Sequence, residues 1–316
     1  MDPRFRLRSV KRIWDAGEHN AFPELVHYGG QWICAFREAS KHMSFDGVVR
    51  VLISKDGESW SHAATLTHPE GDLREVRASV TPDGQLLFHG CLNFADSKRY
   101  QSLVWSSNDG MHWSDGQPIG EPQYWNWRVR WRGDMAYSVA YHTWTEDGEK
   151  RLQGARLMRS PDGLTWETWV PDLLQEYGPN EADLAFLPDH SAIGLFRRDD
   201  EEVTTTLMGR ADRPYSDWTF TDCGIPFHCP NILPLPTGEW LAGGRLWDPL
   251  RTGLCLLNPE VGSLTEVLSL PSDGDTGYPG MVLKNDQLWI AYYSSHEEKT
   301  SIYLAQVSID GLTAPH

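Results

Sequence analysis

Ser54-Lys55-Asp56-Gly57-Glu58-Ser59-Trp60 is the stretch that decides the fold, because its pattern returns further along the chain. Ser107–Trp113 and Ser160–Trp166 share the pattern S-x-D-G-x-x-W, and the tryptophans of the three copies lie 53 residues apart. A degraded fourth copy, Tyr215-Ser216-Asp217-Trp218, follows 52 residues later. Asp-Gly is typical of a hairpin turn, because glycine accepts a positive φ and aspartate accepts hydrogen bonds from the turn's N–H groups. We therefore interpret the aspartates as turn residues and expect the tryptophans to pack between sheets.

Short β-rich runs, each broken by a turn, occur six times at intervals of about 50 residues and are each followed by a third strand. The six runs are Phe22–Ile33, Val76–Phe88, Val129–Val139, Ala182–Leu195, Ile232–Ala242 and Pro279–Ile290. The third strands are Val48–Ser54, Ser102–Ser107, Leu152–Ser160, Thr204–Gly209, Gly253–Leu257 and Ser301–Val307.

These repeats predict an all-β fold, a six-bladed β-propeller that forms a single domain over residues 1–316. The box turns should lie between the third and fourth strands of each blade. An N-terminal strand, Leu7–Trp14, should pair with the last blade and close the ring, which removes exposed sheet edges. At most a short helix is expected, at Pro171–Tyr177. A pair of β-sandwiches fits the constant period less well.

Composition excludes several classes of protein. The chain has 316 residues, is 40% hydrophobic, and carries 28 Lys+Arg against 44 Asp+Glu, a net charge of −16. Such an acidic chain is not expected to bind nucleic acid or an anionic membrane, and no apolar run is long enough to span a bilayer. The N-terminus has no apolar signal segment, so a cytoplasmic protein is expected. Five scattered cysteines without a C-x-x-C pair disfavour disulfides and zinc. No metal and no cofactor is predicted, and the oligomeric state stays open.

In a propeller, the start of each first strand and the end of each second strand surround the central funnel. Polar and aromatic residues gather at these positions, while the middles of the strands are aliphatic, which is typical of a binding site. Six arginines there favour an anionic ligand, because the guanidinium group matches a carboxylate, although each could instead pair with a neighbouring acidic residue. The arginines are Arg37, Arg74, Arg128, Arg197, Arg198 and Arg245. Further candidates for ligand contact are Asn20, Asn231, His296, Trp127 and Trp125, the tryptophans by stacking on a sugar face.

Over nearly its whole length the chain resembles the sialidase (neuraminidase) superfamily and its Asp-box, or BNR, repeats. Phe22-Pro23-Glu24-Leu25 looks like the opening strand of that family, and Gly277-Tyr278-Pro279 looks like the segment of its nucleophilic tyrosine. Asn180-Glu181, with Arg197-Arg198 after it, resembles the family's glutamate and one of the three arginines that hold a carboxylate. Gly244-Arg245 falls where the third of these arginines is expected.

One feature departs from the family. Its first arginine should stand directly before the apolar-Pro pair, but the sequence there reads Asn20-Ala21-Phe22-Pro23. Arg37 or Arg74 could replace the missing arginine from a neighbouring position. The resemblance therefore implies the fold and a glycosidic site more strongly than it implies sialic acid.

The resemblance implies a mechanism in which Tyr278 is the nucleophile. A phenol is protonated at neutral pH, so Glu181 is expected to accept its proton, which requires the two side chains to meet across the funnel. The general acid is expected on the Ser40–Asp46 loop, with Asp46 as first choice and His42 as second. Phe45 could raise the pKa of Asp46 by desolvation. The alternative for Asp46 is a turn residue before Gly47.

Three functions are compatible with these residues. The first is a glycoside hydrolase that removes a terminal, acidic sugar from a small or oligosaccharide substrate. The second is a polysaccharide lyase acting on uronates, with His142 or His296 beside Tyr278. The third is a carbohydrate-binding propeller without catalysis. A metal held by His19, His142 and His296 is a weaker alternative, because their spacing gives no metal motif.

Overall fold

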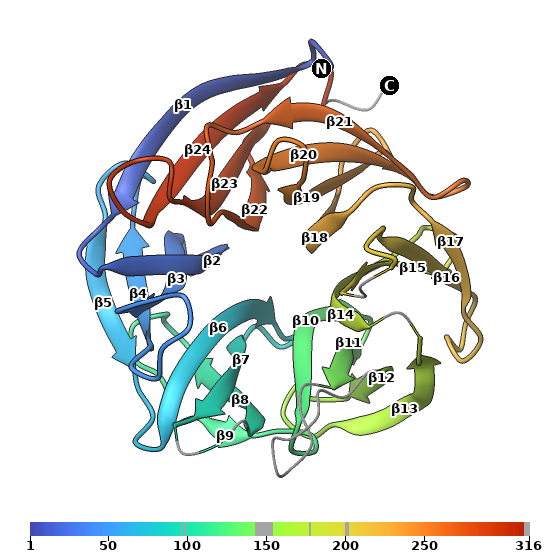
Figure 1. The fold of residues 1–316 in the computed structure, drawn as a ribbon, viewed down its shortest axis with the longest axis horizontal. Helices are drawn as coiled ribbons and strands as arrows, with labels where there is room; N and C mark the ends of the chain where they lie inside the picture. The colour runs from blue at the N-terminus through green and yellow to red at the C-terminus, as the bar shows by residue number, and fades with distance from the viewer. Residues whose placement is uncertain (96, 98, 143–153, 177, 200–201, 313–316) are drawn as a thin grey trace.

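The structure is a computed structural model that describes residues 1–312, apart from residues 96, 98, 143–153, 177 and 200–201. Within the described residues the chain forms 24 β-strands and no α-helix. There is therefore no helix among them that could cross a bilayer. The strands make six four-stranded antiparallel sheets. Figure 1 shows the sheets arranged radially around one axis, with the innermost strand of each next to the centre. The predicted six-bladed propeller is therefore confirmed.

The bounds of the strands follow the chain. They are β1 (Phe5–Trp14), β2 (His19–Tyr28), β3 (Gln31–Ala39), β4 (Val48–Ser54), β5 (Ser61–Leu66), β6 (Gly71–Val80), β7 (Leu86–Phe94), β8 (Tyr100–Ser107), β9 (Gln117–Pro118), β10 (Tyr124–Arg132), β11 (Met135–His142), β12 (Ala155–Ser160), β13 (Glu167–Leu174), β14 (Pro179–Phe186), β15 (Ala192–Arg198), β16 (Leu207–Ala211), β17 (Thr219–Asp222), β18 (Phe227–Pro234), β19 (Trp240–Leu246), β20 (Arg251–Asn258), β21 (Ser263–Ser269), β22 (Gly277–Lys284), β23 (Gln287–Ser294) and β24 (Ser301–Ile309).

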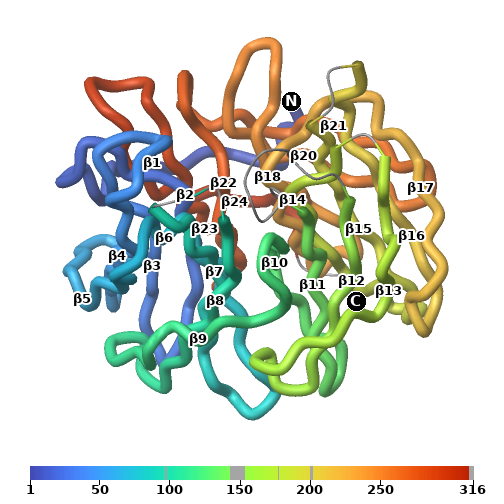
Figure 2. Tube along the Cα trace, turned by 60° about the horizontal axis from the view of Figure 1, so that its bottom comes forward, coloured from blue at the N-terminus to red at the C-terminus, as the bar shows by residue number. Residues whose placement is uncertain are grey.

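The N-terminal strand closes the ring, as predicted. β1 pairs antiparallel with β24, from Phe5 opposite Ile309 to Trp14 opposite Ile302, and completes the sheet β1-β24-β23-β22. The blue first strand thus lies beside the red last ones in Figures 1 and 2. Strands from the two ends of the chain therefore share one sheet, with β1 as its outermost strand.

The short helix expected at Pro171–Tyr177 is wrong. This stretch continues β13, which pairs with β12 through Val170 opposite Leu157. Leu173 is buried, so the cross-strand pairing and this burial decide the conformation. Tyr177, and Leu152 at the expected start of a third strand, lie outside the described residues.

The S-x-D-G-x-x-W turns have a structural role, as interpreted from the sequence. Asp56 Oδ1 accepts hydrogen bonds from the backbone N–H groups of Glu58 at 2.8 Å and Ser59 at 2.9 Å. Gly57 has a φ of 76°, and its carbonyl accepts a hydrogen bond from Trp60 Nε1 at 3.2 Å. In the degraded fourth copy, Tyr215 takes the glycine position with a φ of 68° and accepts the corresponding hydrogen bond from Trp218.

The glycine of each complete turn also docks the blade onto the preceding one. A Cβ on Gly57 would lie 2.4 Å from the Trp289 ring on β23, and a Cβ on Gly110 would lie 2.2 Å from Ile33 on β3. Gly163 faces Leu87 on β7 at 2.6 Å in the same way. The glycine shared by the three copies therefore meets two requirements, a positive φ and a close approach to the sheet of the preceding blade.

Candidate active site

All six innermost strands contain a β-bulge at the same level of the funnel. In β2, β6, β10, β14, β18 and β22 the antiparallel register shifts by one residue, so two residues of the inner strand lie opposite one residue of its partner. The residues set out of register are Phe22-Pro23, Arg74-Glu75, Trp127-Arg128, Asn180-Glu181, Cys229-Pro230 and Tyr278-Pro279. Bulges redirect side chains and are common beside active sites. This ring of bulges brings residues that are far apart in sequence together around the axis.

Three of the bulges hold their first residue in the left-handed region. Phe22, Cys229 and Tyr278 have φ values of 60°, 47° and 52°, and a proline follows each of them. A positive φ is costly for a bulky residue and persists only where the surroundings enforce it. Cys229 Sγ accepts a hydrogen bond from the Tyr278 N–H at 3.1 Å, which ties two of these bulges together.

Glu181 and Tyr278 meet across the funnel. The Tyr278 hydroxyl donates a short hydrogen bond to Glu181 Oε1, and both side chains are buried. Glu181 Oε2 accepts from the Cys229 N–H at 2.8 Å and pairs with Arg197 Nη1 at 2.9 Å. The contact expected from the sequence is therefore present.

The electrostatic environment sets the protonation of this pair. Burial raises the pKa of Glu181, but Arg197 and the Tyr278 hydroxyl outweigh it and lower the pKa to about 2. Burial, together with the Glu181 charge, raises the pKa of Tyr278 well above its ordinary value. The resting pair is thus a neutral phenol that donates to a carboxylate.

Three arginines surround this pair. Arg197 also pairs with Asp199 at 2.8 Å, and Arg245 donates to the Tyr293 hydroxyl at 2.9 Å. The Arg245 guanidinium lies 5.9 Å from the centre of the Tyr278 ring. Arg74 lies 5.2 Å from the centre of the Phe22 ring, which itself packs against Tyr278 at 4.7 Å. The structure therefore places Arg74, Arg197 and Arg245 at one end of the funnel.

His42 lies at the same end and is held by a carboxylate. Its Nδ1 is 2.6 Å from Asp275 Oδ2, and His19 Nε2 is 2.9 Å from the same oxygen. Asp275 Oδ1 accepts from the Tyr293 hydroxyl at 2.7 Å. Burial raises the pKa of Asp275, but the hydrogen bonds from His19 and His42 outweigh it and hold the pKa far below its usual range. The His42 ring packs edge-on against Phe22, and its side chain is 43% exposed.

His19, His42 and Asp275 are also the one group of described His, Cys, Asp and Glu residues whose ligand atoms are close enough to hold a metal, all within 4.8 Å of one another. Both imidazoles are at hydrogen-bond distance from one carboxylate oxygen, so two N–H donors account for the arrangement. We assign no metal to it. The metal set considered from the sequence is not assembled: His296 contacts Ser294 and Tyr303, and His142 contacts Tyr124.

Asp46, the first choice for the general acid, lies outside this cluster. Its carboxylate accepts hydrogen bonds from the Ser40 backbone at 3.2 and 3.3 Å, and the side chain is exposed. The pKa of Asp46 is lowered by hydrogen bonding to Ser44 and Ser40, whereas desolvation by Phe45 was expected to raise it. Phe45 is 54% exposed and so cannot desolvate the carboxyl group. Asp46 is an exposed loop residue that ties the loop to the Ser40 backbone.

Three of the six candidate arginines have structural partners away from Tyr278. Arg37 is fully buried, binds Asp72 at 2.7 Å and fixes the 40–46 loop through the Lys41 carbonyl. Arg198 donates to Asp222 at 2.5 Å on the outer part of its blade. Arg128 pairs with Glu24 at 2.7 Å deeper along the axis. Each of these three arginines is thus held by a neighbouring carboxylate, and their contact with a ligand stays a prediction.

The remaining sequence candidates also make contacts within the protein. The Asn20 side chain binds the Gly17 and Thr300 carbonyls, and Asn231 donates to the Pro279 carbonyl at 2.8 Å. His296 is exposed at the outer side of its blade and contacts Tyr303. Trp127 is 1% exposed and packs edge-on against Tyr278, so its face is not open for sugar stacking. Trp125 is stacked between Tyr100 and Tyr141.

Sequence reasoning missed Asp275, Cys229 and Glu75. Asp275 lies only three residues before Tyr278, so its place in the funnel loop was an available signal. Cys229 looked like a buried apolar residue, and only the register reveals its contact with Tyr278. Glu75 is 3% exposed, its Oε2 has no hydrogen-bond partner in the described part of the chain, and burial raises its pKa.

Comparison with known proteins agrees with the fold. No protein-family model and no curated protein matches the sequence. A protein of unknown function from Dyadobacter fermentans superposes with a TM-score of 0.83 at 21% identity, over 97% of this chain and all of that one. The Penicillium chrysogenum α-L-arabinanase in complex with arabinobiose gives a TM-score of 0.74 at 13% identity, over 97% and 99% of the two chains.

The Trypanosoma rangeli sialidase, solved as a covalent intermediate with 2,3-difluorosialic acid, gives a TM-score of 0.71 at 14% identity. It is matched over 98% of this chain but only 60% of its own length. These likenesses establish that the chain has the six-bladed fold of sialidases and arabinanases. The two glycosidases bind different sugars within the same fold, so a shared fold does not by itself specify the substrate.

Proposed function

We propose that this protein is a glycoside hydrolase that removes a terminal sugar carrying an anionic group. The observation that carries the proposal is the hydrogen bond from the Tyr278 hydroxyl to Glu181, with Arg74, Arg197 and Arg245 around it. The glycosidases that share the fold support hydrolysis as the reaction class. Tyr278 and Glu181 are 8% and 2% exposed. A substrate therefore has to displace Phe22, which packs against Tyr278, and His42, which packs against Phe22.

Tyr278 attacks the anomeric carbon, and the bond from that carbon to the leaving oxygen breaks. The pKa of Tyr278 is raised and that of Glu181 is about 2, so the proton does not leave the phenol in the resting enzyme. It passes to Glu181 as the new Oη–carbon bond forms, because an oxygen with three bonds is strongly acidic. Glu181 thereby prevents positive charge from building up on the tyrosine.

His42 supplies the proton to the leaving oxygen. Asp275 holds its Nδ1, which directs Nε2 of the half-exposed ring away from the carboxylate. In the second half-reaction, neutral His42 takes a proton from water, the water oxygen bonds to the anomeric carbon, and the Oη–carbon bond breaks. Tyr278 then recovers its proton from Glu181. Two displacements at one carbon give retention of configuration.

The arginines favour an acidic sugar. Arg197 and Arg245 keep an accessible edge, with side chains that are 17% and 13% exposed. Arg74 lies beside Phe22, close to the position of the arginine that the sequence lacks before Phe22-Pro23. Three fixed guanidinium groups around the Tyr278–Glu181 pair match a carboxylate better than a neutral hydroxyl set.

The lyase alternative requires His142 or His296 beside Tyr278 as the base. Among the described residues, the aromatic rings in contact with Tyr278 are those of Phe22, Trp127 and Tyr293, and neither His142 nor His296 is among them. A carbohydrate-binding propeller remains as an outcome of the test below.

The test measures release of nitrophenol from 4-nitrophenyl glycosides of sialic acid, glucuronic acid and α-L-arabinofuranose. We expect turnover of an acidic member, and a fall of at least about 10³-fold in kcat for Tyr278→Phe. Tyr292→Phe is the matched control, because this buried tyrosine donates only to the Pro271 carbonyl at 2.9 Å. A derivative of the active substrate with a good leaving group, and with fluorine on the carbon next to the anomeric carbon, should label Tyr278, as read by peptide mass spectrometry. Saturable sugar binding without turnover would overturn the proposal in favour of a binding protein.

A further inference from the structure

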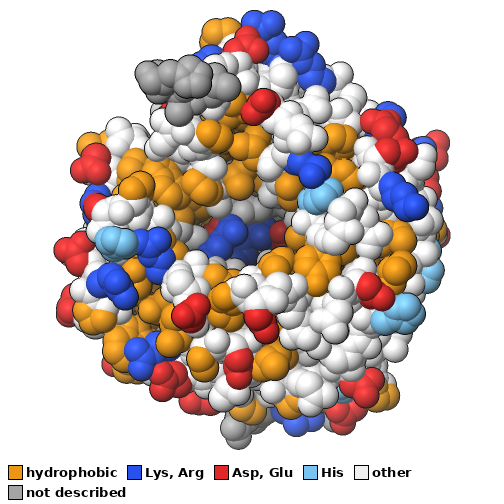
Figure 3. Space-filling view, turned by 180° about the vertical axis from the view of Figure 1, so that it is seen from behind, with side chains coloured by type: hydrophobic (Ala, Val, Ile, Leu, Met, Phe, Trp, Pro, Cys, Tyr) orange, Lys and Arg blue, Asp and Glu red, His pale blue; other side chains and the backbone are white. Residues whose placement is uncertain are grey.

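A cavity of about 470 Å³ opens at the other end of the axis, away from Tyr278. The residues that line it follow the bulges on all six inner strands, so it lies where these strands end. Figure 3 shows the hollow at the centre of this face, with Lys or Arg side chains at its floor. Its size is within the range of small-molecule sites, about 300–1,000 Å³.

A layer of packed side chains separates this cavity from the candidate active site. The Arg77 guanidinium lies between Trp127, at 4.9 Å from the ring centre, and Tyr278, at 5.2 Å. Arg128 crosses the axis, pairs with Glu24 at 2.7 Å and donates to the Pro279 carbonyl at 3.3 Å. A molecule in the cavity therefore meets Arg128 and does not reach the Tyr278 hydroxyl.

The ion pairs next to the cavity contain three arginines and two carboxylates, and the further buried carboxyl group near Arg77 is Glu75, whose pKa burial raises. Glu24 is shared by Arg77 at 3.4 Å and Arg128 at 2.7 Å, while Asp183 pairs with Arg130 at 2.6 Å. These five groups carry three positive and two negative charges. Burial, and the nearby charges of Arg77 and Arg130, lower the pKa of Arg128. A surplus cation in a buried cluster is stabilised by an added anion.

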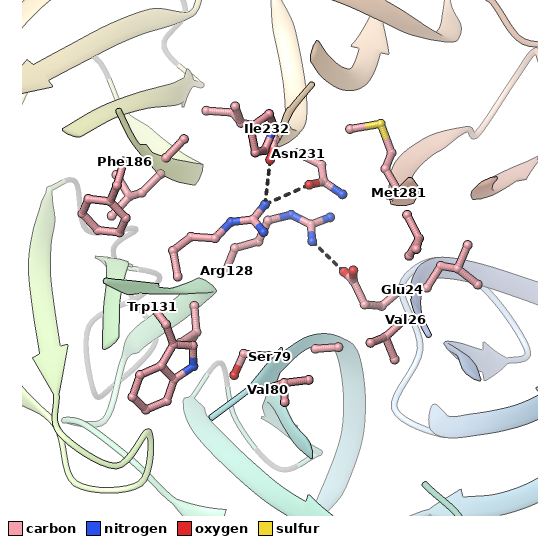
Figure 4. Close-up of a pocket in the computed structure, with 18 of the residues that line it drawn as sticks. Glu24, Val26, Ser79, Val80, Arg128, Trp131, Phe186, Asn231, Ile232 and Met281 are labelled. Atoms are coloured by element: carbon pink, nitrogen blue, oxygen red, sulfur yellow. Dashed lines mark hydrogen bonds and ion pairs between the residues drawn. The ribbon is translucent and has the colours of Figure 1, made fainter. Parts of the chain in front are cut away.

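Arg130 is the positively charged group of this network that is partly exposed in the cavity. Its side chain is 31% exposed, whereas the Asp183 side chain that it pairs with is fully buried. Its Nε and Nη2 bind Asp183, and Nη2 also donates to Asn231 at 2.9 Å. Its Nη1 makes no hydrogen bond to the described residues and so remains as a donor for a ligand. Figure 4 shows the Arg128–Glu24 pair and the Asn231 side chain around the centre of the cavity.

Two neutral donors in the wall also lack partners. Ser79 Oγ and Trp131 Nε1 are buried and make no hydrogen bond in the described part of the chain, and both residues line the cavity. Ser79 is 8% exposed. Neither atom has accessible surface in this structure, so neither donates to a molecule in the cavity unless its side chain moves. The rest of the wall is apolar and is formed in part by Val26, Val80, Phe186 and Met281 (Figure 4).

We propose that this cavity is a second binding site, for a small organic monocarboxylate with an apolar body. The carboxylate binds Arg130 Nη1, and the body packs against Phe186, Val80 and Met281. The site is independent of the reaction at Tyr278, because the Arg77 and Arg128 layer lies between them.

The experiment is isothermal titration of the full chain with phenylacetate, and with phenylacetamide as the neutral probe of the same shape. We expect saturable binding of phenylacetate and at least tenfold weaker binding of phenylacetamide. Val80→Trp should fill the cavity and abolish binding, and Val282→Trp does the same from another strand should the first variant fail to fold. Tyr278→Phe should bind phenylacetate as the wild type does.

Absence of saturable phenylacetate binding would overturn the proposal, as would equal affinity for phenylacetamide. Binding that survives a folded cavity-filling variant, or that is lost in Tyr278→Phe, would place the ligand elsewhere and overturn it too. None of these results depends on whether the protein hydrolyses a glycoside.

Discussion

Replacement of Glu181 by glutamine tests the electrostatics of the funnel directly. The carboxyl pKa falls from its ordinary value of 4.5 to about 2 in the folded protein, a difference of about 2.5. At about 1.4 kcal/mol for each pKa unit, the ionised carboxylate contributes about 3.5 kcal/mol to the free energy of unfolding at pH 7. Glu181 is 2% exposed, so solvent screening does not reduce this value. We expect Glu181→Gln to lower the free energy of unfolding by about that amount, measured by urea denaturation.

The pH dependence gives the sharper result. A carboxyl group with a lowered pKa stabilises the fold above its unfolded pKa, and the stabilisation is lost as the pH falls towards the folded pKa. The difference between wild type and Glu181→Gln should therefore shrink between about pH 4.5 and pH 2. Asp222→Asn is the matched control: it breaks the Arg198 pair of the same blade, but the Asp222 side chain is 47% exposed, so at most about 1 kcal/mol is expected. A difference for Glu181→Gln that stays constant across this pH range would refute the reasoning.

Three further outcomes are expected. Asp275→Asn should lower kcat about 10²-fold, because the imidazole that Asp275 orients loses its partner. Asp46→Asn, in an exposed loop outside the site, should leave kcat unchanged, and equal losses would contradict the assignment of the acid. Glu75→Gln should gain free energy of unfolding relative to the wild type as the pH rises above the ordinary carboxyl range, because burial raises the pKa of Glu75 and disfavours its charged form; a gain at low pH alone would argue otherwise. Gly163→Ala should lower the free energy of unfolding by about 1–3 kcal/mol more than Gly29→Ala. Both glycines have a positive φ, but only at Gly163 would the new Cβ lie 2.6 Å from a neighbouring blade. Equal urea midpoints for the two variants would show that the contact between blades tolerates the methyl group.

The fold was largely predictable because its signals are local and repeated. The Asp-Gly turns, at Asp56 for example, are fixed by hydrogen bonds within a few residues. The constant spacing of the repeats indicates the number of blades. The strand Leu7–Trp14 was expected to close the ring, and it pairs with β24 from Phe5 onward. The helix expected at Pro171–Tyr177 failed because β12 competes for the same backbone groups, which a single segment does not reveal.

The site was predictable only in part. Topology alone brought Glu181 and Tyr278 to one level of the funnel, so their contact could be foreseen. The roles of the arginines could not, because Arg37 and Arg197 have similar sequence surroundings. Arg37 is consumed by Asp72, whereas Arg197 keeps an accessible edge beside Glu181. Such differences depend on which carboxylate of another strand lies within about 3 Å, where charged hydrogen bonds are strong.

By itself the sequence determined the number of blades, their turns and the level at which polar residues cluster, because short-range hydrogen bonds and a strict period specify these features. Only the tertiary structure decided which side chains face the funnel, that His42 and not Asp46 joins Asp275, and that a basic hollow opens at the far end of the axis. The physical reason is that bulges and buried ion pairs are settled between strands of different blades. No spacing along one strand records the partner that another strand supplies.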